Sequence, residues 1–104
     1  MSKLLEKQQK FSQMVSQLIR YSNYLGYKVT LGEAYAYAED KRHISSSNHY
    51  RRLAIDLNLF TDFNYITDTK DYQKLGEYWE MLGGSWGGRF GDGNHFSLEH
   101  NGVK

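Results

Sequence analysis

The segment from Leu53 to Phe60 alternates between two kinds of side chain, and this pattern constrains the fold more than any other feature. Its odd-numbered residues are all leucine or isoleucine, whereas its even-numbered residues include Asp56 and Asn58. A period of two is typical of a β-strand that buries one face. We therefore predict a strand over residues 52–60, with an aliphatic face in the core and Asp56 on the opposite face.

Other periodic segments predict the elements around this strand. Apolar residues recur mostly three, four and seven apart over residues 3–25, which predicts an amphipathic helix that stops at Gly26. The same spacing predicts a second helix over residues 71–82. Residues 33–40 fit either a short helix or an extended edge. Shorter strands are expected at residues 27–31, 65–66 and 96–98. This order indicates an α+β fold, in which helices pack on one face of a small antiparallel sheet.

Composition limits the classes of protein that remain. A chain of 104 residues without an evident internal repeat predicts one domain over residues 1–104, and we expect a monomer. The chain has no cysteine, so disulfides and thiolate metal ligands are excluded. A net charge of +1 argues against a nucleic-acid partner. No apolar stretch or signal-peptide core predicts membrane insertion or export, so we expect a cytoplasmic protein.

Two segments supply the side chains of a candidate zinc site. His49 and Asp56 come from the first segment, and Asp92 and His95 follow a glycine-rich run at residues 83–88, which we expect to be loop or tightly bent strand. Hydrolytic zinc is usually held by three such N and O ligands, with a fourth position open for water. His49, Asp56 and His95 can fill the three ligand positions, which leaves Asp92 to act on the water.

Each residue also has a simpler interpretation when it is taken alone. Asp56 would be costly to bury unpaired, but a salt bridge to Arg51 or Arg52 would satisfy it as well as a metal would. Asp92 stands between glycines and suits a turn. His43 and His100 lack comparable surroundings, so we interpret them as surface residues. The tryptophans differ as well: Trp79 lies on a helical stripe typical of a core, whereas Trp86 in the glycine-rich run is a candidate for a cleft.

The ordered pattern resembles one family of zinc peptidases. Its parts are Ser47-x-His49, then Asp56, then Trp86-Gly87-Gly88-Arg89-Phe90 leading to Asp92-x-x-His95-Phe96. It is similar to the zinc D-Ala-D-Ala carboxypeptidase and L-alanyl-D-glutamate peptidase family (VanY-like, M15 type). The resemblance runs from about residue 27 to residue 99, which would be the catalytic part. The compact length looks most like the small bacteriophage endolysin branch.

The resemblance implies roles for individual residues. It implies that His49, Asp56 and His95 bind Zn²⁺ and that Asp92 is the general base and acid. Two departures from the family pattern stand out. Arg52 occupies a position where the family usually has glycine. Ala36 aligns with an upstream arginine whose role in the family is either to polarise the scissile carbonyl or to hold substrate. We expect three residues to contact the substrate: Ser47, Arg42 in place of the missing arginine, and Trp86.

These observations predict zinc-assisted amide hydrolysis. The resemblance implies a peptidoglycan stem peptide as substrate, cut between L-Ala and D-Glu, with D-Ala-D-Ala carboxypeptidase activity as the alternative. Another alternative is a weakened zinc domain that only binds cell wall, and a third is a structural domain without metal. An endolysin of this kind would stay cytoplasmic until a holin releases it to the cell wall.

Overall fold

We describe the fold from a computed structural model, which places residues 3–32 and 51–104. The described part is α+β, with two α-helices and a five-stranded antiparallel sheet, as the sequence predicts. No helix in residues 3–32 or 51–104 is long and apolar enough to cross a membrane. The elements, in chain order, are α1 (Lys3–Tyr24), β1 (Lys28–Leu31), β2 (Ala54–Thr61), β3 (Asn64–Ile66), the 3-10 helix η2 (Thr69–Tyr72), α2 (Gln73–Met81), β4 (Ser85–Trp86), the 3-10 helix η3 (Gly87–Phe90) and β5 (His95–Ser97).

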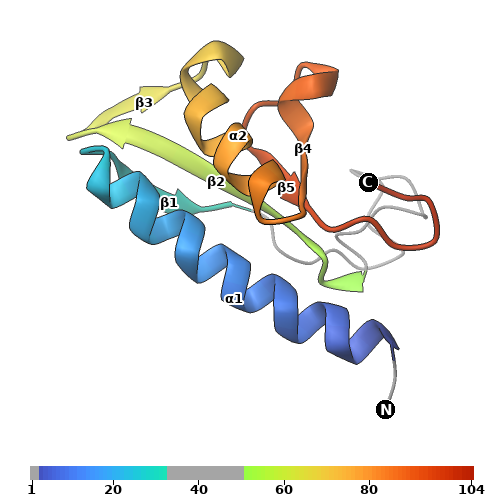
Figure 1. The fold of residues 1–104 in the computed structure, drawn as a ribbon. Coiled ribbons are helices and arrows are strands. Elements are labelled where there is room, and N and C mark those ends of the chain that lie inside the picture. Colours follow the sequence, from blue (N-terminus) through green and yellow to red (C-terminus); the bar gives the residue numbers. More distant parts are fainter. Residues whose placement is uncertain (1–2, 33–50) are drawn as a thin grey trace.

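Strand β2 is the long central strand of the sheet (Figure 1). On one side it pairs with β1. On the other side its first half pairs with β5 and its second half with β3, and β5 pairs in turn with β4. The described strands therefore run in the order β1-β2-β5-β4, with β3 beside the far end of β2. Because β2 contacts three strands, it positions nearly every other part of the sheet.

Both helices cover the same face of the sheet (Figure 1). The odd-numbered residues of β2 point into this layer, and Leu57 and Leu59 are completely buried. They pack with Phe11 and Leu18 of α1 and with Trp79 of α2. The even-numbered residues Asp56 and Asn58 lie on the opposite face and are partly exposed. The predicted division of β2 into a core face and a polar face is confirmed.

Most predicted elements are present with small shifts of their ends. The first helix ends at Tyr24 and is followed by Gly26, whose φ of 95° is left-handed. The second helix is preceded by the 3-10 turn Thr69–Tyr72, which the apolar spacing did not indicate. In the glycine-rich run, a short strand and a 3-10 turn form where loop or bent strand was expected. The segment 33–40 lies outside the described residues.

The hydroxyl of Tyr72 joins β2 to β3. It accepts a hydrogen bond from the Leu59 amide at 3.0 Å and donates one to the Ile66 carbonyl at 2.7 Å. Tyr72 is almost completely buried, and this burial raises the pKa of its phenol above the usual value. The neutral phenol thus acts as a link between two neighbouring strands.

We expect Tyr72→Phe to lower the free energy of unfolding by about 1 to 3 kcal/mol, because buried backbone groups lose a partner.

The raised pKa of Tyr72 predicts that the free energy of unfolding also depends on pH. The folded state resists ionisation of Tyr72, so its stabilisation is complete below about pH 10 and is lost as pH rises further. Urea unfolding at pH 8 and at pH 10.5 measures both effects. An equal alkaline loss in wild type and Tyr72→Phe would contradict the assignment to Tyr72.

The turn between β2 and β3 contains a strained aspartate. Thr61 pairs with Asn64, so Asp62 and Phe63 form a two-residue turn, and Asp62 has a φ of 54°. Positive φ at the first central residue favours glycine. We expect Asp62→Gly to raise the free energy of unfolding by about 0.5 to 1 kcal/mol. The contact of Asp62 with Lys28 is exposed and 3.9 Å long, so its loss should matter little. A lower midpoint of thermal unfolding in Asp62→Gly would contradict this prediction.

Candidate metal centre

The pairing of β2 with β5 places Asp56 directly opposite His95. Both side chains lie on the face of the sheet away from the helices, because Leu57 and Phe96 beside them point into the core. His95 Nδ1 lies 3.3 Å from Asp56 Oδ1. The two side chains are 17% and 25% exposed, respectively. A carboxylate and an imidazole that are distant in sequence thus meet at a partly open position.

Two glycines allow the chain to pass close to this pair. The Gly32 amide donates to the Asp56 carbonyl at 2.6 Å, and a Cβ atom at Gly32 would lie 2.9 Å from the Asp56 Cβ. On the other side, a Cβ atom at Gly87 would lie 2.7 Å from the His95 Cβ. Real Cβ atoms do not approach this closely. Larger side chains at these positions would therefore displace the strands that carry Asp56 and His95.

A turn holds Asp92 close to His95 in the chain. The Asp92 amide donates to the Gly87 carbonyl at 2.9 Å, and the His95 amide donates to the Asp92 carbonyl at 3.2 Å. These main-chain bonds fix the turn without the Asp92 carboxylate. Asp92 itself is exposed to solvent.

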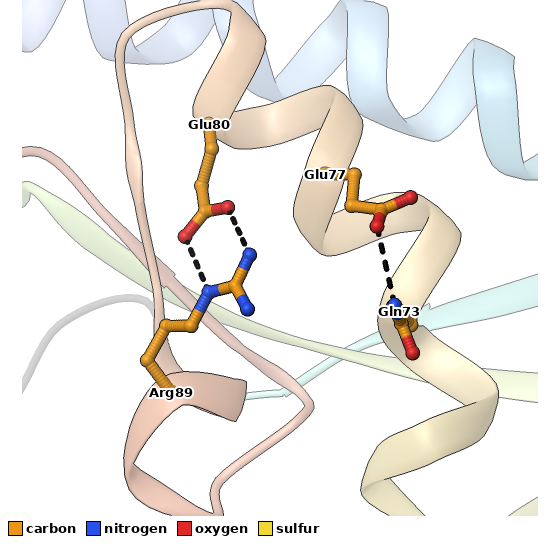
Figure 2. A network of polar contacts seen from close by, with 4 residues as sticks. All are labelled: Gln73, Glu77, Glu80 and Arg89. Carbon is orange, nitrogen blue, oxygen red and sulfur yellow. Dashed lines mark hydrogen bonds and ion pairs between the residues drawn. The ribbon is translucent and has the colours of Figure 1, made fainter.

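An ion pair ties η3, at the start of this turn, to α2 (Figure 2). Arg89 donates two hydrogen bonds to the Glu80 carboxylate, at 3.0 and 2.7 Å. The hydrogen bonds from Arg89 lower the pKa of Glu80. The Arg89 guanidinium also lies 5.3 Å from the centre of the Trp86 ring. Figure 2 also shows Gln73 bonded to Glu77 on the preceding turns of α2, at 3.2 Å.

Trp86 occupies a different position from the cleft that the sequence predicted. Its side chain is only 4% exposed and packs in the core beside Gly76. Its indole N–H donates to the Gly93 carbonyl at 2.8 Å. Trp86 therefore supports the turn between Asp92 and His95 from inside and presents almost no surface to a substrate. The glycine-rich surroundings suggested exposure, but here the glycines make room for the buried ring.

Two asparagines next to the pair were not singled out from the sequence. Asn94 Nδ2 donates to Asn58 Oδ1 at 2.9 Å, and the Tyr65 hydroxyl donates to the same oxygen at 3.2 Å. Asn58 follows Asp56 by two residues on β2, and Asn94 directly precedes His95. The spacing of Asp56 and Asn58 could have predicted that Asn58 lies near the site, because residues two apart on a strand share a face.

The structure brings together two of the predicted site residues. Asp56 and His95 meet, but within residues 3–32 and 51–104 no three His, Cys, Asp or Glu side chains form a group that could hold a metal ion. The Asp92 carboxylate therefore does not complete such a group. His49, Ser47 and Arg42 lie outside the described residues, as does Ala36.

The Asp56–His95 pair fits two of the ligand positions of a zinc ion. Imidazole nitrogen and carboxylate oxygen are both usual zinc donors. Two donors bound to one tetrahedral ion at about 2.0 to 2.2 Å lie about 3.3 to 3.6 Å apart. The 3.3 Å between His95 Nδ1 and Asp56 Oδ1 agrees with this separation. The chemistry and spacing of the pair are thus compatible with two zinc ligands on adjacent strands, and 3.3 Å is also the length of an ordinary ion pair between the two side chains.

The departure at Arg52 has a structural counterpart. Arg52 has a φ of 57°, which is left-handed. Glycine adopts this conformation most easily, whereas other residues do so at some cost. The backbone at Arg52 therefore has the conformation that glycine adopts most easily, and glycine is the usual residue at this position in the zinc peptidase family that the sequence resembles.

Comparison with known protein families identifies one match. A protein-family model described as D-alanyl-D-alanine carboxypeptidase matches residues 40–98, more than half of the chain. The matched region includes β2, β5 and the turn that carries Asp92. No curated protein matches the chain.

Proposed function

Because this chain belongs to the D-alanyl-D-alanine carboxypeptidase family M15, a family of zinc metallopeptidases, we propose that it hydrolyses an amide bond in the peptide stem of peptidoglycan. Substrates of this class are implied by the family. The observation that carries the proposal is the Asp56–His95 pair, in which two zinc-type donors from separate strands lie 3.3 Å apart.

The residues that would hold zinc are Asp56, His95 and, as the third ligand, His49. When bound, zinc supplies Lewis acidity, which polarises the scissile carbonyl and lowers the pKa of a water molecule. The backbone pairing of β2 with β5 holds Asp56 and His95 in place before substrate arrives. This preorganisation avoids rearranging the two strands during the reaction.

Asp92 is the proposed proton carrier. In this role its carboxylate takes a proton from the attacking water and later donates it to the nitrogen of the leaving amine. Its exposed side chain and the main-chain bonds of its turn support the assignment, because the carboxylate remains available for proton transfer. Ser47 and Arg42 are proposed to contact the substrate, as the sequence pattern implies. Trp86 is proposed to act indirectly, through the turn that it supports.

Two bonds of the stem peptide are candidates for hydrolysis. The description of the matching family favours the terminal D-Ala-D-Ala bond. The motif from Ser47 to Phe96 also resembles that of phage endolysins, which favours the L-Ala-D-Glu bond. An endolysin role would place the protein in the cell wall after release by a holin.

We further propose that residues 1–104 act as one monomeric peptidase domain. Phe11, Met14 and Leu18 of α1 pack in the same core as Leu57 of β2 and Trp79 of α2. The N-terminal helix is therefore part of the same core and stabilises the sheet that carries the proposed zinc ligands.

Digestion of purified peptidoglycan tests the proposal and separates the two bonds. The zinc-loaded protein is incubated with cell walls, and the released fragments are identified by mass spectrometry and end-group labelling. Free D-Ala would indicate the carboxypeptidase, whereas new amino termini on D-Glu would indicate the endopeptidase. The absence of any cleaved stem peptide, with zinc bound, would refute the proposed function.

A further inference from the structure

The face of the sheet that carries Asp56 and His95 continues along β2 with uncharged polar groups. Asn58 comes next on this face, about 7 Å beyond Asp56 at the usual rise of a strand. Asn94 lies beside it through the 2.9 Å bond between the two amides. The side chains of both asparagines are partly exposed. The Asn58–Asn94 amide pair thus lies directly beside the candidate zinc ligands.

The hydrogen bonds within this pair determine which atoms remain available. Asn58 Oδ1 accepts from both Asn94 Nδ2 and the Tyr65 hydroxyl. Each amide has one further polar atom. In Asn58 this atom is Nδ2, a donor, and in Asn94 it is Oδ1, an acceptor. Neither atom forms a hydrogen bond within residues 3–32 and 51–104. One donor and one acceptor side by side complement the C=O and N–H of a peptide backbone.

We propose that the Asn58–Asn94 amide pair is a substrate-positioning subsite that hydrogen-bonds the backbone of the stem peptide about two residues from the scissile bond. The inference rests on the proposed function and specifies how the substrate lies. An extended peptide advances about 3.3 Å per residue, so the 7 Å between Asp56 and Asn58 corresponds to two residues. The substrate therefore runs along β2, and a dipeptide that spans only the scissile bond does not reach the pair.

A purely structural role for the pair is the competing explanation, because the same bond joins β2 to the start of β5. The two explanations differ in their dependence on substrate length. A positioning role affects the binding of a long peptide and leaves that of a dipeptide unchanged. A structural role affects the binding of both peptides equally, since loss of the amide pair would displace Asp56 and His95, which both peptides contact.

The test uses the zinc-loaded full chain and the pentapeptide L-Ala-D-Glu-L-Lys-D-Ala-D-Ala, which contains both candidate bonds. KM and kcat are measured for wild type, Asn58→Ala and Asn94→Ala. The dipeptide spanning the cleaved bond serves as a competitive inhibitor. Phe63→Ala is the matched control, since Phe63 is 94% exposed at the tip of the β2–β3 hairpin.

We expect each asparagine variant to raise the KM for the pentapeptide roughly tenfold, the effect of losing one hydrogen bond. The kcat should stay within about twofold of wild type, and the inhibition constant of the dipeptide should not change. Phe63→Ala should behave as wild type. An unchanged KM in both asparagine variants would overturn the subsite while leaving the peptidase intact. Parallel weakening of pentapeptide and dipeptide would overturn it in favour of the structural role. A wild type that cleaves no pentapeptide and no cell wall would remove the proposed function, and the subsite with it.

Discussion

His95→Ala should purify without zinc and without measurable peptidase activity. His95 Nδ1 lies 3.3 Å from Asp56 Oδ1, and removal of the imidazole leaves Asp56 as the remaining donor of this pair. Loss of an outer-shell partner of a zinc ligand already costs about 10 to 100-fold in metal affinity, so loss of the ligand itself should cost more than about 100-fold. Metal analysis of untagged wild type and His95→Ala, side by side, measures the effect.

His100→Ala is the control for the loss of a histidine. The His100 ring lies 3.4 Å from Lys7 Nζ, near the N-terminal end of α1, and it is paired with Val103 through the backbone. No sequence motif places His100 in the zinc site, and we expect this variant to retain about one zinc per chain. Equal zinc content in His95→Ala and wild type would refute the ligand assignment. A wild type that binds no zinc, even when zinc is supplied, would refute the metal centre as a whole.

Asp92→Asn should retain zinc but hydrolyse the stem peptide about 10² to 10⁴-fold more slowly, the usual contribution of general acid–base catalysis. The substitution keeps the shape of the side chain and removes its ability to take up a proton. The turn should survive, because its hydrogen bonds use the Asp92 backbone amide and carbonyl. The expected loss therefore lies in kcat, while KM and zinc content stay close to wild type.

The matched control for this prediction is Asp71→Asn, which neutralises another exposed aspartate, on η2. It should leave kcat unchanged. A kcat for Asp92→Asn within a few-fold of wild type would assign proton transfer to another group. Loss of zinc from Asp92→Asn would instead place Asp92 among the ligands.

The sequence predicted the elements whose pattern reflects local burial. The alternation over residues 53–60 predicted β2 and its two faces, and apolar spacing predicted α1 and α2 within a few residues. The 3-10 turn before α2 was not anticipated, and the short strand β4 falls in the run that was expected to be loop or bent strand. Their reasons are tertiary, since the Tyr72 hydroxyl bonds to β2 and β3, and the Trp86 ring packs in the core.

In the candidate site, too, some features could be predicted from the sequence and others depend on tertiary packing. Residue type and order singled out Asp56, Asp92 and His95 as candidates, because only a few kinds of side chain bind zinc or move protons near neutral pH. Their roles in zinc binding and proton transfer are predictions. The same holds for the roles of His49, Ser47 and Arg42, which lie outside the described residues. Trp86 was expected to line a cleft, and the structure places it in the core beneath the turn. Exposure depends on what packs against a side chain, which a glycine-rich sequence does not reveal.

The sequence by itself determined the chemistry of this protein: the donor types, the period of β2, and an order of motifs typical of a zinc peptidase. Only the tertiary structure decided that Asp56 faces His95, that glycines allow the chain to approach both residues, and that Asn58 and Asn94 form an amide pair beside them. The physical reason is strand register. The pairing of β2 with β5 joins residues 39 positions apart, and a shift of one residue would turn the side chains to the opposite face.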